Sequence, residues 1–287
     1  MANRRELVKR RKAARNIKKI TRTMQLIATA RFQAAFNRAV ATRPYSDKLA
    51  ELVADLSRAA GGDAGHPLMA KQDNVENSAL VVITSNRGLC GGYNANVLRT
   101  AIEHLDQTEG PVDVHMVGKK GSNYFRFVQR EVADATLDLD EKVRFDQVEP
   151  IANELIRRFT DGEIRSAHVA YMRFHSSSRQ TPEVMQLLPL APESGEGAAK
   201  GSVEYEFSPD PQALLDDLLP ASVRMRLFQC FTDSVVSEQV ARMVAMKAAT
   251  DAAGDMITNL TRQYNRARQT HITMELLDIV GGANALA

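Results

Sequence analysis

Residues 221–280 decide the fold, and they read ASVRMRLFQCFTDSVVSEQVARMVAMKAATDAAGDMITNLTRQYNRARQTHITMELLDIV. They lie between Pro220 and the pair Gly281–Gly282, and they contain no proline and one glycine, Gly254. Helices of globular proteins usually run roughly 8–20 residues. At about 1.5 Å per residue, this segment would form a helix roughly 90 Å long. The pattern therefore predicts one long helix that begins after Pro220 and stops at Gly281–Gly282.

Apolar and small side chains recur along this segment at steps of three and four residues. The average spacing is close to the 3.5-residue period of a coiled-coil seam. The expected seam consists of Val236, Val240, Met243, Met246, Ala249, Ala253, Met256, Leu260, Tyr264, Ala267, His271 and Met274. A seam of this kind requires a partner helix.

The beginning of the chain supplies the partner. A proline-free helix is expected from about Asn3 to Arg43, with a seam of Ala13, Ile17, Ile20, Met24, Ile27, Arg31 and Ala34. Because the intervening chain leaves the first helix near residue 56 and enters the second near residue 210, the two helices must be antiparallel. Facing residue numbers should then sum to about 266, which places Met24 opposite Arg242 and Met1 opposite Asn265.

This register leaves residues 266–280 without a partner in the chain. Their apolar side chains are Ile272, Met274, Leu276, Leu277, Ile279 and Val280. An exposed apolar surface on a helix end is a candidate for insertion into another protein.

Composition narrows the class of protein. The 287 residues suit one or two domains, and 37 basic against 35 acidic side chains select no type of partner. Cys90 and Cys230 stand far apart, which argues for a reducing compartment and against a disulfide scaffold. No apolar run approaches the roughly 18 residues of a membrane span, and no signal peptide precedes the first helix. We therefore expect a soluble chain that reaches a membrane only through partners.

The charge is uneven along the chain. The first 31 residues carry eleven basic side chains against one acid, Glu6. A nucleic-acid-binding arm, a cleavable arginine-rich transit peptide and a solvated or partner-facing side of the helix are three interpretations. Interleaved aromatic residues and a nucleic-acid recognition motif are missing, and a transit peptide is not expected to keep a coiled-coil seam. We favour the helix surface, which would suit an acidic collar.

The middle of the chain has a different pattern. Pro44 is expected to end or kink the first helix, after which residues 45–60 resume a helical pattern and residues 61–77 form a polar connector. Strands are then expected at 79–84, 112–117, 131–136 and 167–174, and helices at 94–107, 124–128 and 145–159. An antiparallel hairpin of 182–190 with 203–207 is expected at the sheet edge.

This alternation predicts an α/β domain with a mainly parallel, Rossmann-like sheet and right-handed crossovers. The expected organisation is a coiled-coil helix at 1–60, the inserted α/β domain at 78–208, and a second coiled-coil helix at 209–287 that pairs with the first as one discontinuous domain.

A glycine-rich turn, SNRGLCGGYN at residues 85–94, leaves a strand and enters a helix. Such turns can bind phosphate through backbone amides, but this one matches neither GxGxxG nor GxxxxGK[ST]. The segment GKKGS at residues 118–122 matches neither motif. A tight turn that lets the helix pack on the sheet is the favoured interpretation, with a nucleotide site as the alternative. Cys90 in this turn is either a nucleophile or, as we favour, a packing residue. The six histidines are scattered, so we expect no catalytic, cofactor-binding or metal-binding residue.

Four stretches carry a resemblance to a known family. IKKITRTMQLIATARF at 17–32, TSNRGLCGGYN at 84–94, TPEVMQLLPL at 181–190 and the segment from Ser237 to Gly282 resemble the gamma subunit of bacterial F-type ATP synthases. The similarity covers nearly the whole chain and is closest to the proteobacterial form. Between Leu190 and Val203 there is no cysteine-bearing insertion of the chloroplast type, so thiol regulation is not expected.

The resemblance implies a non-catalytic rotor shaft, present in one copy per complex. Its partners would be three alpha and three beta subunits, the epsilon subunit and the ring of c subunits. Rotation driven by proton flow would change the nucleotide affinity of each catalytic site in turn. The chain would lie at the cytoplasmic face of the bacterial inner membrane as a peripheral protein, held there by the complex.

The resemblance also implies contact residues. Met24 and Arg242 match positions that meet acidic lever loops of the beta subunits, and Arg268, Gln269 and Thr273 match positions that hydrogen-bond beta-subunit loops near the tip. Tyr205 and Glu206 correspond to the foot that meets the c ring, although the local sequence there departs from the family pattern. Two other classes stay open at this point: an enzyme using Cys90 or the turn at 88–92, and a coiled-coil scaffold or nucleic-acid binder using the basic arm.

Overall fold

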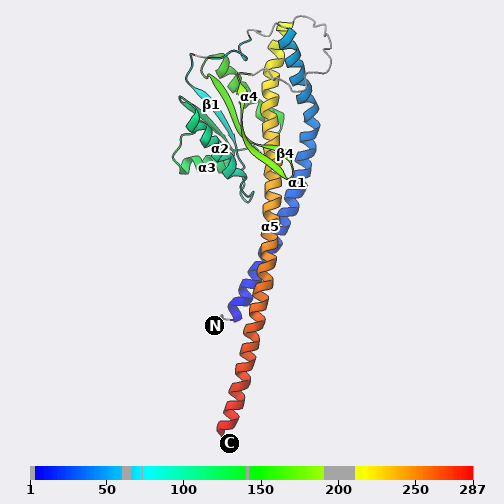
Figure 1. The fold of residues 1–287 in the computed structure, drawn as a ribbon, viewed down its shortest axis with the longest axis vertical. Coiled ribbons are helices and arrows are strands. Elements are labelled where there is room, and N and C mark those ends of the chain that lie inside the picture. The colour runs from blue at the N-terminus through cyan, green and yellow to red at the C-terminus, as the bar shows by residue number, and fades with distance from the viewer. Residues whose placement is uncertain (1–3, 60–65, 73, 140–141, 191–210, 287) are drawn as a thin grey trace. The chain divides into compact units, whose positions relative to one another are not determined.

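A computed structural model describes residues 4–59, 66–72, 74–139, 142–190 and 211–286. Along the chain, the long helices α1 (Arg4–Ala59) and α5 (Pro211–Leu286) come before and after an α/β segment (Figure 1). Between them, in chain order, lie β1 (Ser78–Ile83), α2 (Tyr93–Gln107), β2 (Val112–Val117), α3 (Lys119–Phe127), β3 (Asp134–Thr136), α4 (Phe145–Thr160), β4 (Ser166–Ser176) and β5 (Arg179–Leu188). Within the described residues, no helix is both long and apolar enough to cross a bilayer.

The chain forms two compact units, and each of the two long helices contributes to both. Unit 1 consists of residues 1–30 and 242–287, which are the first part of α1 and the last part of α5. Unit 2 consists of residues 31–241, which hold the sheet, its helices and the remaining parts of α1 and α5.

The sheet of unit 2 has five strands in the order β3-β2-β1-β4-β5. β1 pairs in parallel with β2 and β4, and β3 pairs in parallel with β2, so the predicted Rossmann-like parallel sheet is confirmed. β5 pairs antiparallel with β4, from Ala167↔Leu188 to Ser176↔Arg179, and forms an edge of the sheet. The expected partner strand at 203–207 lies outside the described residues.

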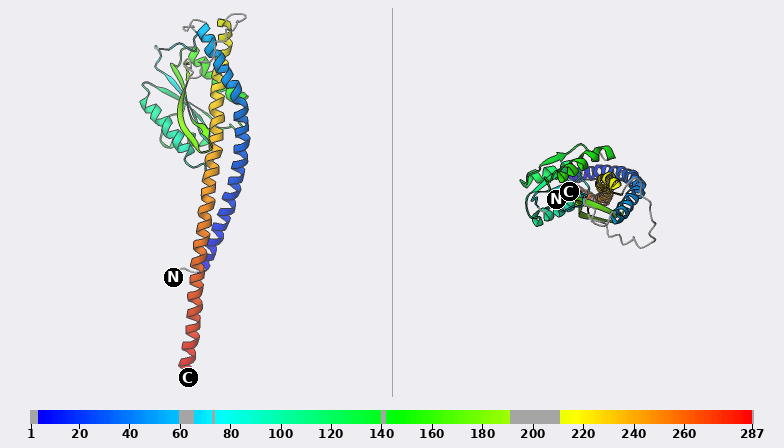
Figure 2. Two further views of the ribbon diagram at one scale, coloured as in Figure 1. Left: turned by 45° about the vertical axis from the view of Figure 1, so that its right-hand side comes forward. Right: turned by 90° about the horizontal axis from the view of Figure 1, so that it is seen from above.

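Side chains of β1 alternate between two hydrophobic cores on opposite faces of the sheet, as strand geometry requires. Ala79, Val81 and Ile83 pack with α4 and with the α5 segment from Leu215 to Phe231. Leu80 and Val82 pack with α2 and with Phe125 of α3. All six residues of β1 are buried, and Figures 1 and 2 show the helices of unit 2 on both faces of the sheet.

The ends of the two long helices differ from the prediction. α1 continues through Pro44, and α5 begins at Pro211 and continues through both Pro220 and Gly281–Gly282. A proline inside a helix costs about 3 kcal/mol and a glycine about 1 kcal/mol. At Pro220 the buried side chains of Leu219 and Val223 stabilise the helix on both sides, which offsets the lost hydrogen bond.

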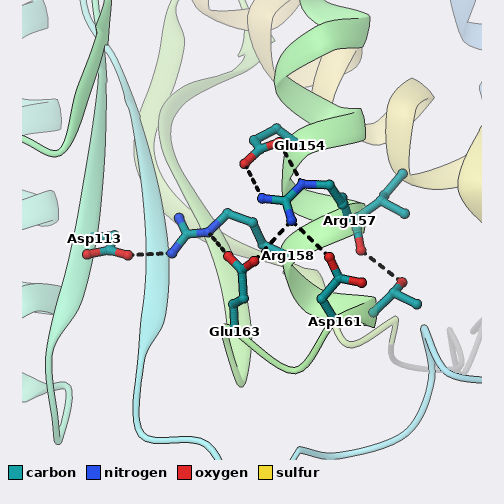
Figure 3. Close-up of polar contacts among 8 residues, drawn as sticks. Asp113, Glu154, Arg157, Arg158, Asp161 and Glu163 are labelled. Carbon is teal, nitrogen blue, oxygen red and sulfur yellow. Dashed lines mark hydrogen bonds and ion pairs between the residues drawn. The ribbon is translucent and has the colours of Figure 1, made fainter.

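Charged side chains fix the end of α4 to the neighbouring turn and to β2 (Figure 3). Arg157 pairs with Glu154 and Asp161 at 2.8 Å each and with Glu163 at 3.0 Å, while Arg158 pairs with Asp113 of β2 and with Glu163. The hydrogen bonds from Arg157 lower the pKa of both glutamates. Because five of these six side chains are at least 39% exposed, the network positions the turn more than it stabilises the fold.

Candidate functional site

In unit 1, α1 and α5 form an antiparallel pair (Figures 1 and 2). Leu7 and Ala14 of α1 are buried with Leu260 of α5, and Ile257, Tyr264 and Ala267 pack against them. The guanidinium of Arg11 lies 5.0 Å from the ring centroid of Tyr264, a distance typical of a cation–π contact. The hydroxyl of Thr250 donates a hydrogen bond to that of Thr21 at 2.8 Å. The predicted antiparallel coiled coil is therefore confirmed.

The register differs from the prediction. The numbers of the Thr21–Thr250 pair sum to 271 and those of the Arg11–Tyr264 pair to 275, rather than to about 266. The reason is that α1 extends to Ala59 and α5 begins at Pro211, so the inner ends of the two helices already sum to 270. Met24 and Arg242 are therefore offset by roughly five to nine residues along the pair instead of facing each other.

The seam of α1 lies one position away from the predicted one. The expected seam residues Ile17, Ile20 and Ile27 are 52%, 59% and 47% exposed, and Ala13 and Ala34 are also exposed. The buried and half-buried positions are instead Leu7, Arg11, Ala14, Thr21, Gln25 and Ala28. Of the predicted seam residues in unit 1, Met24 is half-buried as expected. Ala14, Thr21 and Ala28 are small, and the distance between packed helices depends on the side chains at the contact. The more apolar stripe of the sequence is consequently part of the outer surface of unit 1.

The seam of α5 follows the prediction more closely. Met246, Ala253 and Leu260 are buried as expected. Met256 is 54% exposed, and its neighbour Ile257 occupies the seam instead. His271 and Met274 were assigned to the seam, but both are exposed because they lie beyond the paired part of the helix.

The end of α5 is an exposed helical tip, which we define as residues 268–281. Every side chain in this range is exposed, including all six apolar ones: Ile272 (51%), Met274 (48%), Leu276 (58%), Leu277 (61%), Ile279 (73%) and Val280 (48%). In both views of unit 1, α5 runs on past the N-terminal end of α1 (Figures 1 and 2). The predicted bare apolar tip is confirmed.

The expected contact residues have different surroundings. Arg268 and Gln269 are exposed on the tip, where the Thr273 hydroxyl donates to the Gln269 carbonyl at 3.0 Å. Met24 is half-buried, whereas Arg242 is only 6% exposed. Tyr205 and Glu206 lie outside the described residues.

The outer surface of α1 in unit 1 combines charge with apolar side chains. Nine of its ten basic residues are exposed, namely Arg4, Arg5, Lys9, Arg10, Lys12, Arg15, Lys18, Lys19 and Arg22. Ile17 and Ile20 flank Lys18 and Lys19 on this same exposed stretch. Sequence reasoning missed the combination because it assigned the isoleucines to the seam.

The glycine-rich turn is held by hydrogen bonds within the protein. The Ser85 amide donates to the Asn94 side chain at 3.0 Å, and the Asn94 amide group donates to Ser85 Oγ at 2.8 Å and to Cys90 Sγ at 3.3 Å. Cys90 is 2% exposed and belongs to a hydrophobic core. These contacts support the structural interpretation of the turn and of the thiol.

In unit 2, His104 of α2 and His168 of β4 lie against each other. The rings of His104 and His168 are 4.7 Å apart, and His168 Nδ1 is buried without a hydrogen-bond partner among the described residues. Burial, together with the charges of His104 and Arg165, lowers the pKa of His168 to about 4. Burial lowers the pKa of His104 as well. Both rings are thus neutral packing groups at pH 7.

This pair predicts a loss of stability in mild acid. Between pH 6.5 and pH 4, His168 is protonated in the unfolded chain but not in the folded chain. The free energy of unfolding is therefore highest above pH 6.5 and falls as the pH approaches 4. We expect about 2 kcal/mol from this residue after allowance for solvent screening. Urea unfolding at pH 7 and pH 4.5 measures it, and His168→Phe should make the pH dependence shallower. An unchanged slope in this variant would contradict the assignment.

Comparison with known proteins places the chain in a family. The family model described as ATP synthase matches residues 3–286. The ATP synthase gamma chain of Rhodopirellula baltica is 44% identical over 295 residues, covering 100% of this chain and 99% of the relative. The chain belongs to the ATP synthase gamma chain family. The gamma chain of Leptospira biflexa is 39% identical, with full coverage of both chains.

The fold of this gamma chain is similar to that of chains in solved structures. A rotor chain of the Euglena gracilis mitochondrial ATP synthase matches with a TM-score of 0.64 at 18% identity, covering 94% of this gamma chain and 98% of that chain. A second structure of the Euglena complex, containing OSCP, F1 and the c-ring, gives a TM-score of 0.66 at 19% identity, with 99% and 94% coverage. At this identity the likeness concerns the fold alone.

Proposed function

We propose that this gamma chain is the central rotor shaft of an F-type ATP synthase. In this role it transmits torque between the proton-driven c ring and a hexamer of three alpha and three beta subunits. The observation that carries the proposal is the exposed apolar tip of α5, which extends past its partner helix in a chain of gamma-chain sequence. Burial of such a surface in a surrounding collar is favourable. The chain itself is a non-catalytic subunit of the enzyme complex.

Torque transmission requires a shaft whose sides differ. Along residues 4–30, ten basic side chains stand against one acid, whereas along 242–281 five basic side chains stand against four acids. The α1 side therefore differs from the α5 side in charge, and it carries the exposed isoleucines. A shaft with the same free energy in every orientation could not change the nucleotide affinity of the catalytic sites around it. This asymmetry lets each beta subunit meet a different surface as the shaft turns.

The remaining parts of the chain take the other tasks of the rotor. The helices at 1–60 and 209–287 act as one discontinuous shaft, and the α/β domain at 78–208 acts as the foot that meets the epsilon subunit and the c ring. Tyr205 and Glu206 are assigned to the c-ring contact, and Met24 and Arg242 to the beta-subunit contact. Attachment through these partners holds the chain at the cytoplasmic face of the bacterial inner membrane, in one copy per complex.

The double variant Arg268→Ala, Gln269→Ala tests the contacts assigned to the tip. We expect the double variant to lower proton-coupled ATP synthesis about tenfold or more, because hydrogen bonds with a charged partner contribute about 1.5–3 kcal/mol each. Helical content of the purified chain should not change, since both side chains are exposed. The measurement is ATP synthesis and ATP-driven proton pumping in membranes that contain the reassembled complex.

The chain offers a matched control. Arg262 and Gln263 are the same pair of residue types, six positions earlier on α5, and both side chains are exposed. Alanine at these two positions makes the same chemical change outside the tip and should leave coupling near the parent value. Equal rates for all three proteins would remove Arg268 and Gln269 from the contact surface.

A further inference from the structure

A cavity of about 600 Å³ lies in unit 2 at the carboxyl ends of β1 and β2. Thr84 and Gly118 lie where these strands end, and Phe231 and Ser234 of α5 contribute to the lining. Parallel α/β sheets bind ligands in the crevice outside the carboxyl ends of their strands. The volume is within the range of small-molecule sites.

The lining of this cavity is rich in cations. It includes Arg31, Arg87, Lys119 and Lys142, against the two acids Asp138 and Glu238. Within the described part of the chain, Lys119 and Lys142 form no salt bridge. Two lysines on separate segments, facing one space, can bind an anion that carries more than one negative charge.

Ser234 gives a second and independent indication of a ligand. Its side chain is 1% exposed and lines the cavity, yet its Oγ has no hydrogen-bond partner among the described residues. Buried hydroxyls almost always have a partner, because an unsatisfied one lowers stability. Rotation of the Ser234 side chain about χ1 would turn this buried hydroxyl toward the cavity, where an oxygen-rich ligand would accept the hydrogen bond that the protein does not supply.

The first backbone amides of α3 do not provide the anion contacts. At the N-terminus of α3, the amide of Lys119 donates to Asn86 Oδ1, that of Lys120 to the Ser85 carbonyl, and that of Gly121 to Thr84 Oγ1. Because these amides already donate to groups of the protein, the N-terminus of α3 does not bind phosphate through its backbone as a phosphate-binding loop does. At this end of α3, recognition must come from side chains such as that of Lys119.

We propose that this cavity is a binding site for a small molecule carrying phosphate groups, held by Lys119, Lys142 and the Ser234 hydroxyl. Lysine binds phosphate as a point charge on a flexible stem, which suits a site without backbone donors. Torque transmission needs no ligand in the α/β domain, so the site is an additional property of the chain. Its failure would leave the rotor proposal intact.

Titration calorimetry on the full-length chain tests the site with phosphate, pyrophosphate and ATP as probes. Pyrophosphate should bind more tightly than phosphate, and its affinity should fall as NaCl screens the charges. The double variant Lys119→Gln, Lys142→Gln should weaken binding at least about tenfold, and Ser234→Ala several-fold. Asp138→Asn should strengthen binding, because it removes a negative charge. ATP binding tighter than pyrophosphate would identify a nucleotide, and equal affinity would identify the phosphate groups alone as the ligand chemistry.

The neighbouring residue Lys120 provides the control. It stands next to Lys119 on α3 but lines a different groove, between α2 and α3, so Lys120→Gln should not change the affinity. Ser234→Ala should stay folded, since it removes an unpaired buried hydroxyl and leaves no new group unsatisfied. Absence of binding by all three probes, or an equal loss in Lys120→Gln and the double variant, would overturn the proposal.

Discussion

We expect a four-residue variant to lose coupling in the assembled complex while the isolated chain stays folded. Its substitutions are Ile272→Gln, Leu276→Gln, Leu277→Gln and Ile279→Gln. These side chains are 51%, 58%, 61% and 73% exposed in the free chain. Full burial of such a side chain contributes about 1.5–3 kcal/mol, so even half of this from four residues is several kcal/mol. A loss of that size lowers the affinity for a surrounding collar more than about a hundredfold.

Two measurements separate assembly from folding. Circular dichroism and thermal unfolding of the purified chain should match the parent, because glutamine is a good helix former and no buried side chain changes. Reconstitution with alpha and beta subunits should show the loss. A control variant with Thr270→Gln and Glu275→Gln alters two exposed polar residues of the same tip and should reconstitute normally. Normal coupling in the four-residue variant would mean that the tip is not buried in the complex.

The elements of this fold could be predicted because their periodicities are strong. Sixty residues without proline predicted the long helix, and the short apolar runs at 79–84 and 167–174 predicted strands of the parallel sheet. The ends of the helices could not be predicted in the same way. Pro44 was expected to end or kink the first helix, and Pro220 and Gly281–Gly282 were expected to bound the second. Packing on both sides of Pro220 compensates for the local cost.

The phase of a seam is harder to predict than its existence. Along α1, two parallel stripes compete, one rich in isoleucine and one rich in alanine and threonine. Hydrophobicity favoured the isoleucine stripe, whereas close helix approach selected the smaller residues. Leu7, Ala14, Thr21 and Ala28 follow one another at seven-residue spacing, and this repeat was available in the sequence as a signal. Regular small residues at seven-residue spacing would have identified the seam.

The functional surface was only partly accessible from sequence. Counting residues between the two helices sufficed to predict the bare tip, since an error of a few residues in register still leaves it unpaired. The same error separated Met24 from Arg242, because a facing pair depends on the register itself. The cavity could not be predicted at all. Its lining comes from α1, α2, α3, α5, the ends of β1 and β2, and the segment between β3 and α4. Only the tertiary fold brings these segments together.

Alanine at Gly118 is expected to destabilise the α/β domain by about 3–5 kcal/mol. Gly118 has φ of +93°, which side chains of L-residues rarely adopt, and an added Cβ would lie 2.2 Å from the Thr84 carbonyl oxygen. That oxygen belongs to the backbone just after β1, and Thr84 is tied to β2 by its amide and hydroxyl, which both donate to the Val117 carbonyl. The contact can be relieved only by moving two central strands apart. Backbone strain and overpacking each cost about 1–3 kcal/mol.

Gly162 provides the comparison that separates these two costs. It also has a positive φ, +71°, but an added Cβ would meet nothing within 4 Å, so Gly162→Ala should cost only about 1 kcal/mol for the left-handed conformation. Urea unfolding of both variants measures the difference. If the two glycines gave equal losses, the close approach of Thr84 to Gly118 would have no energetic weight. A larger loss at Gly118 means that the β1–β2 junction, which also forms one wall of the cavity, requires a residue without a side chain.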